Sequence, residues 1–123
     1  MRPNQLKKLT SQELAQRYVE IGLAQDEALL MDEYGKFSRL FKTMVAIENE
    51  LQSRDGDQRG ILLDLLTHPN EQVRLNAAKA TLAIAPAEAR RTLELLARMS
   101  VGPQAGDAGM CLSNLDRGVF KPT

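Results

Sequence analysis

One stretch of the sequence constrains the fold more than any other: LLTHPNEQVRLNAAKATLAIAP, residues 65–86. A helix is expected after its His-Pro turn, because the residue before a proline avoids the helical region and Asn70 is a good N-cap. Two apolar stripes follow on this helix, Val73, Ala77, Ala80 and Ile84 on one and Leu75, Ala78 and Leu82 on the other. Two stripes require two packed neighbours, and alanines let helix axes approach at the short end of the usual spacing of about 8–10 Å. The sequence therefore predicts that this helix is the middle layer of a stack.

The rest of the chain also carries a helical apolar period. No stretch of four or more residues alternates convincingly as a strand does. We therefore predict an all-α protein of about six helices, paired into three antiparallel hairpins by short connections. A Thr10–Glu13 capping box begins the first helix, and Pro86 suits the first turn of the fifth. The helices are expected to stop at Tyr34–Gly35, around Gly56, at His68–Pro69, at Gly102–Pro103 and before Gly118.

Length and composition favour one domain over residues 1–123, with residues 1–9 and 117–123 as loose ends. Cys111 is the single cysteine, so no disulfide forms within one chain. No run of about 18 or more apolar residues occurs, and we predict a cytoplasmic protein without a membrane partner. The 16 basic and 16 acidic side chains cancel, and aromatic content is 4%. The sequence therefore does not favour nucleic acid as a partner.

The segment LLDLLTHPNEQVRLNAAKATLAIAPAEARRTLELL resembles a HEAT-type repeat. Such a repeat has a leucine-rich helix, a proline-containing turn, a Val-Arg pair and an alanine-rich second helix. More broadly, AQDEALLMDEYGKFSRLF, HPNEQVRLNAAKATLAIAP and PQAGDAGMCL resemble a family of small bacterial proteins classed as a conserved domain of unknown function with a HEAT-like fold. The resemblance implies an α-α superhelix of the HEAT/ARM type, with the second, fourth and sixth helices lining its inner surface. It implies no activity.

The chain departs from the repeat pattern at both ends. The first hairpin lacks the proline turn and the Val-Arg pair, and the third keeps only the break at Gly102–Pro103. We interpret the outer hairpins as caps on a central unit, because terminal repeats need a solvated outer face.

Binding residues are expected on the inner helices. Asn76 and Lys79 should point away from the two apolar stripes, and together with Arg39 and Lys42 they form the predicted protein-binding surface. Arg74 belongs to the Val-Arg pair. In HEAT-type repeats the equivalent arginine commonly pairs with an acidic group of a neighbouring unit, so the resemblance implies a structural ion pair at Arg74.

No chemical constellation emerges from the sequence. His68 is the only histidine and stands before a proline, which favours a capping or surface role. Cys111 lies between Met110 and Leu112, which favours a buried, inert thiol. Acidic residues crowd the first helix without a histidine, and PQAGDAGM lacks the lysine and the preceding strand of a phosphate loop. We therefore expect no metal, no cofactor and no catalytic residues.

Three functions are compatible with the sequence. The favoured one is a non-catalytic protein–protein interaction module, an adaptor or a toxin neutraliser, that binds an unidentified protein through its inner helices. The first alternative is nucleic-acid binding by a basic face built from the later arginines and Lys79. The second is an enzyme of unfamiliar chemistry around His68, Asp64 and Arg74. Homo-oligomerisation is left open, because an incompletely capped stack can bury its end against a copy of itself.

Overall fold

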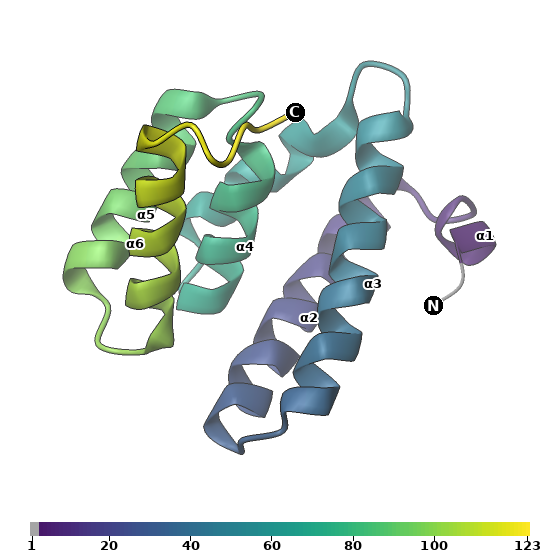
Figure 1. Ribbon diagram of the computed structural model, residues 1–123. Coiled ribbons are helices and arrows are strands. Elements are labelled where there is room, and N and C mark those ends of the chain that lie inside the picture. The colour runs from purple at the N-terminus through teal and green to yellow at the C-terminus, as the bar shows by residue number, and fades with distance from the viewer. Residues whose placement is uncertain (1–2) are drawn as a thin grey trace. The chain divides into compact units, whose positions relative to one another are not determined.

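The computed structural model describes residues 3–123 and is all-helical, as the periodicity predicts (Figure 1). No residue in that range lies in a β-strand. The elements are α1 (Pro3–Leu6), α2 (Ser11–Leu30), α3 (Tyr34–Ser53), the 3₁₀ helix η1 (Gln58–Thr67), α4 (Glu71–Thr81), α5 (Pro86–Met99) and α6 (Pro103–Asp116). None of the helices in the described range is long and apolar enough to cross a membrane. The chain divides into two compact units, residues 1–61 and 62–123. The single domain over 1–123 and the HEAT-like repeat stay predictions.

Unit 1 is built on the α2–α3 hairpin. The Thr10–Glu13 capping box is confirmed, because Glu13 N donates to Thr10 Oγ1 at 3.0 Å and Thr10 N donates to Glu13 Oε1 at 2.9 Å. The helices bury Leu14, Tyr18, Ile21 and Ala28 from α2 and Met44, Ile47 and Leu51 from α3. Tyr18 is fully buried and its hydroxyl donates to Glu48 Oε2 at 2.6 Å. Desolvation, reinforced by the Glu48 carboxylate, raises the pKa of Tyr18, so its hydroxyl stays a donor at neutral pH.

The turn between α2 and α3 differs from the expectation. Tyr34–Gly35 was predicted to end the first helix, but both residues lie in the first turn of α3, and α2 ends at Leu30. The left-handed residue is Asp32, with φ of 55°. Aspartate tolerates this conformation because its short polar side chain bonds locally, and here Tyr34 Oη donates to Asp32 Oδ1 at 3.0 Å. The glycine signal was therefore three residues too late.

Arg54 ties the N-terminal segment to the end of α3. Its Nη2 donates to the carbonyl oxygens of Leu6 (3.1 Å) and Leu9 (2.7 Å), its Nη1 to Ser11 Oγ (3.1 Å) and its Nε to Glu50 (2.9 Å). Leu6 is only 1% exposed. The prediction of a loose end over residues 1–9 is thus wrong for residues 3–9, which carry α1 and are held by a guanidinium; residues 1–2 lie outside the described part.

The leucine-rich segment before His68, which corresponds to the leucine-rich helix of a HEAT-type repeat, is a 3₁₀ helix. Glycine at position 60 weakens an α-helix, and the segment is bounded by Gly56 (φ 78°) and by Pro69. A 3₁₀ connector needs fewer residues per turn and suits such a confined stretch.

Unit 2 contains α4, α5 and α6, and α4 packs against both of the others. Asn70 caps α4 as predicted, since its Oδ1 accepts from Gln72 N (2.9 Å) and Val73 N (3.1 Å). Pro86 and Pro103 stand in the first turns of α5 and α6. The core of the unit comprises Leu75, Ala78, Leu82, Ala89, Leu93, Leu96, Ala108 and Cys111. Of the two expected stripes, Val73 and Ala77 on one and Leu75, Ala78 and Leu82 on the other are buried. Ala80 and Ile84 are only half-buried, and the position of this helix in the middle of a stack stays a prediction.

The C-terminal residues after α6 are exposed for the most part, and the loose end over residues 117–123 stays a prediction. Gly118 adopts φ of 71°, which turns the chain back. The backbone N–H groups of Val119 (2.9 Å) and Phe120 (3.0 Å) both donate to Asn114 O, so the tail begins against the end of α6.

Arg54→Ala is expected to lower the free energy of unfolding of unit 1 by about 1–3 kcal/mol, because two carbonyl oxygens and the Glu50 carboxylate lose their donor. Urea titration followed by circular dichroism measures the change. Arg17→Ala, at an exposed position of α2, is the control and should stay within about 0.5 kcal/mol of the parent. Equal effects of the two substitutions would contradict the role given to Arg54.

Candidate protein-binding groove

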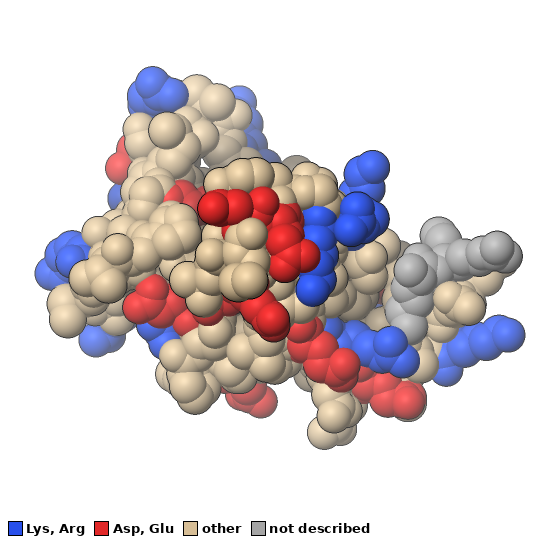
Figure 2. Space-filling model, turned by 90° about the horizontal axis from the view of Figure 1, so that it is seen from below, with Lys and Arg blue, Asp and Glu red and all other residues tan. Residues whose placement is uncertain are grey.

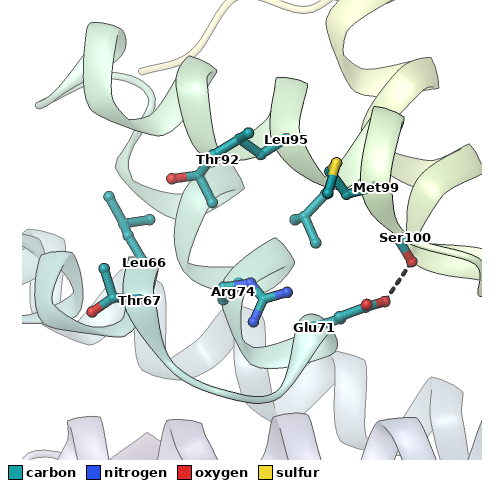
Figure 3. Close-up of a pocket in the computed structure, with 9 residues that line it drawn as sticks. Leu66, Thr67, Glu71, Arg74, Thr92, Leu95, Met99 and Ser100 are labelled. Atoms are coloured by element: carbon teal, nitrogen blue, oxygen red, sulfur yellow. Dashed lines mark hydrogen bonds between the residues drawn. The ribbon is translucent and has the colours of Figure 1, made fainter.

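A pocket of about 350 Å³ opens on unit 2 where η1, α4 and α5 meet (Figure 3). This volume lies at the lower end of the range of ligand sites in proteins. We call it the unit 2 groove and define it by its lining residues: Leu66, Thr67, Glu71, Arg74, Thr92, Leu95, Leu96, Met99 and Ser100.

Arg74 is held in the groove by backbone carbonyls. Its Nη1 donates to His68 O at 2.8 Å and to Pro69 O at 3.1 Å. These two carbonyls precede the Asn70 cap and lie outside the bonding pattern of α4, so a side chain one turn into the helix can reach them. Within residues 3–123, Arg74 forms no salt bridge. The predicted structural ion pair is therefore wrong, because the proline turn supplies neutral acceptors to the guanidinium.

Glu71 is engaged on the opposite side of the groove. Ser100 Oγ donates to Glu71 Oε2, the contact drawn in Figure 3, and accepts from Gly102 N at 3.2 Å. Glu71 stands in the first turn of α4, where the helix dipole also favours a negative charge. The groove's own carboxylate is thus directed to the end of α5.

The wall formed by α5 is apolar and open to solvent. Leu95 is 43% and Met99 74% exposed, and Val101 just beyond the helix is fully exposed. At 3.6 residues per turn, Arg91 and Arg98 lie along the outer edge of the same stripe. Both are exposed, and neither forms a salt bridge among the described residues. The groove and its α5 edge therefore combine an apolar wall with three arginines that form no salt bridge within residues 3–123.

The binding surface predicted from the sequence is not reproduced at Asn76. This residue is 5% exposed and accepts from Gln72 Nε2 at 3.0 Å, while Gln104 Nε2 donates to Gln72 Oε1 at 2.9 Å. A buried chain of side-chain amides thus links α4 to α6. The prediction was wrong because α4 buries polar as well as apolar faces, which hydrophobic periodicity cannot reveal.

None of the three predicted cations is among the residues that line the groove. Lys79 pairs with Asp107 of α6 at 3.0 Å, on a partly exposed surface of unit 2. Arg39 and Lys42 are exposed one turn apart on α3, in unit 1. The role of these residues in binding stays a prediction.

The candidate catalytic residues take part in the fold or are exposed at its surface in the part of the chain described. His68 Nδ1 accepts from Asn70 N at 3.0 Å, which stabilises the turn before α4. Asp64 is exposed on η1. Cys111 is 6% exposed, and burial raises the pKa of its thiol. In the described range no group of three or more His, Cys, Asp or Glu side chains is arranged to hold a metal ion.

Acidic and basic side chains are interspersed on the face shown in Figure 2, and no continuous basic area covers its described residues. Arg90 of the later helices is already paired, with Asp116 at 2.9 Å and Glu94 at 3.5 Å. Arg90 holds the pKa of the Asp116 carboxyl below its ordinary value. Two of the cations considered for a basic face, Arg90 and Lys79, are thus compensated locally.

Comparisons with known proteins agree with this fold. The family model described as "Domain of unknown function (DUF2019)" matches residues 12–116, so the chain belongs to this family. Among solved structures, the chain is similar to the crystal structure of the protein RPA1889 from Rhodopseudomonas palustris CGA009. The two are 51% identical, with a TM-score of 0.93, and the match covers 96% of this chain and 98% of that one. No curated protein matches the chain.

The groove itself is not predicted by the sequence. Thr92, Leu95 and Met99 recur at helical spacing on α5, beside the buried stripe of Ala89, Leu93 and Leu96. That spacing is visible in the sequence, but it does not show which apolar stripe is covered by a neighbour.

Alkylation of Cys111 by iodoacetamide at neutral pH is expected to be slow in the native protein, because the raised pKa lowers the thiolate fraction and burial limits access. Mass spectrometry over time measures labelling. Rapid labelling should appear only in denaturant, and a native rate equal to that of a free thiol would contradict the burial of Cys111.

Proposed function

We propose that this protein is a non-catalytic protein–protein interaction module that uses the unit 2 groove to bind an acidic, partly apolar segment of another protein. The observation that carries the proposal is the exposed Leu95–Met99 wall beside the fixed guanidinium of Arg74. The proposal differs from the sequence-based one in position, because the groove lies on η1, α4 and α5. The single cysteine supports a cytoplasmic setting.

Burial of the apolar wall would contribute favourable free energy to binding. Covering exposed apolar surface is favourable by about 25 cal/mol per Å². Methionine and arginine are also enriched in protein interfaces, and methionine adapts its shape to varied partners. Met99, 74% exposed at the mouth of the groove, is suited to this role.

The Arg74 guanidinium would favour partners that carry carboxylates. Two carbonyl oxygens fix its Nη1, and its remaining N–H donors are not engaged by a carboxylate in the described structure. A planar guanidinium binds a carboxylate through two parallel hydrogen bonds, and a fixed side chain loses less entropy on doing so. Arg91 and Arg98 add positive charge along the α5 edge. An adaptor or a toxin neutraliser would use such a site to hold a partner without altering it.

Affinity capture from a cytoplasmic extract tests the proposal. Leu95→Asp and Met99→Asp place a carboxylate in the apolar wall, and each is expected to weaken retention of the captured partner about tenfold or more. Met110→Asp is the matched control, because Met110 is 61% exposed on α6 and does not line the groove.

Quantitative mass spectrometry compares the three variants with the parent protein, and thermal melts establish that each is folded. A partner retained by the parent and by Met110→Asp but lost by both groove variants supports the proposal. Retention that is the same for every variant contradicts it.

A further inference from the structure

We infer that the occupant of the unit 2 groove is a second copy of this chain, which presents the turn between its α2 and α3. This inference rests on the proposed function, because it assigns the partner of the same groove. Its starting point is a second exposed apolar surface: Leu30 is 79%, Met31 66% and Tyr34 64% exposed. We call these residues, with their acidic neighbours in 26–34, the α2–α3 tip.

The tip has the charge that the groove lacks. The segment DEALLMDEY, residues 26–34, contains Asp26, Glu27, Asp32 and Glu33 and no basic residue. Only Lys36 and Arg39 follow on the first turns of α3, so acidic side chains outnumber basic ones there. At the groove and its α5 edge the excess is positive, because Arg74, Arg91 and Arg98 form no salt bridge within residues 3–123, whereas Glu71 bonds to Ser100. Carboxylates beside leucine and methionine are the chemistry that such a groove selects.

The tip is also held in one conformation before it binds. Glu33 N donates to Ala28 O at 2.8 Å, and Met31 N donates to Glu27 O at 3.1 Å. Tyr34 Oη bonds to Asp32 Oδ1 at 3.0 Å across the left-handed residue. Because the turn is already ordered, binding does not have to supply the free energy of ordering a loop.

The tip and the groove are different surfaces of one chain. When two copies are joined by only one tip–groove contact, one tip and one groove stay unoccupied. When two copies insert their tips into each other's grooves, the tip–groove contact forms twice and the assembly closes as a symmetric dimer. Each charge pair then acts twice in the same particle. Charge reversal on one surface should therefore affect self-association strongly.

The test combines two double variants with sedimentation velocity and light scattering over a concentration series. In the tip variant, Glu27→Lys and Glu33→Lys reverse two exposed charges. In the groove variant, Arg91→Glu and Arg98→Glu reverse the α5 edge. Neither pair removes a hydrogen bond that holds the fold. The matched controls change the same charges elsewhere in unit 1: Glu20→Lys with Asp55→Lys, and Lys7→Glu with Lys8→Glu, all at exposed positions.

The parent protein and both controls are expected to form dimers. Dimerisation should weaken when salt rises from about 0.1 M to about 1 M, because the screening length falls from about 10 Å to about 3 Å. Each charge-reversed variant alone should dimerise at least about tenfold more weakly, since it brings like charges together in both contacts. An equimolar mixture of the tip and groove variants should recover the dimer, because each tip then meets a groove of opposite charge.

A parent protein that stays monomeric over the whole series overturns the inference, as does a mixture that fails to dimerise. Neither result bears on the capture experiment with Leu95→Asp and Met99→Asp. Groove-dependent capture of a different protein by a monomeric parent would refute self-association alone, whereas capture that is independent of the groove would refute the proposed function.

Discussion

The burial of α4 is the constraint on which unit 2 depends. Val73, Leu75, Ala77 and Ala78 are each no more than 1% exposed, so apolar contacts surround much of the helix. Alanine makes this arrangement possible, because a small side chain lets neighbouring helices pack closely against the same backbone. Three polar residues of α4, Gln72, Asn76 and Thr81, are buried as well. Gln72 Nε2 donates to Asn76 Oδ1, and Gln104 Nε2 of α6 donates to Gln72 Oε1. Every buried amide paired in this way avoids the cost of a lost hydrogen bond.

The turn before α4 connects the fold to the groove. Asn70 caps the helix, His68 accepts from Asn70 N, and the carbonyls of His68 and Pro69 receive Arg74. The turn at residues 68–70 therefore begins a helix and also fixes a cation at the mouth of a pocket. Local bonding in the turn explains why Arg74 needs no acidic partner within the fold. The positive charge of Arg74 therefore stays available to a partner, beside the apolar wall that α5 provides. This combination of a fixed charge and an apolar wall is the basis of the proposed interaction role.

Residues with local partners were predicted well, and residues with distant partners were not. The Thr10–Glu13 box, the Asn70 cap and the prolines at the starts of α5 and α6 depend on atoms within one helical turn, and all are confirmed. Asp32 took the left-handed position expected at Gly35, because a hydrogen bond from Tyr34 compensates for the side chain. Arg54 orders residues 3–9 through bonds that span more than 40 positions along the chain. No local sequence pattern predicts contacts between residues so far apart.

By itself, the sequence determined that the protein is helical, where most helices begin and end, and that α4 has two packed sides, because propensity, capping and periodicity act over a few residues. Only the tertiary structure decided that Asn76 is buried and that Leu95 and Met99 remain uncovered. These properties depend on which face of each helix meets a neighbour. Packing between segments far apart in sequence determines which face is covered. The candidate binding groove is the surface that no neighbouring helix of the described chain covers.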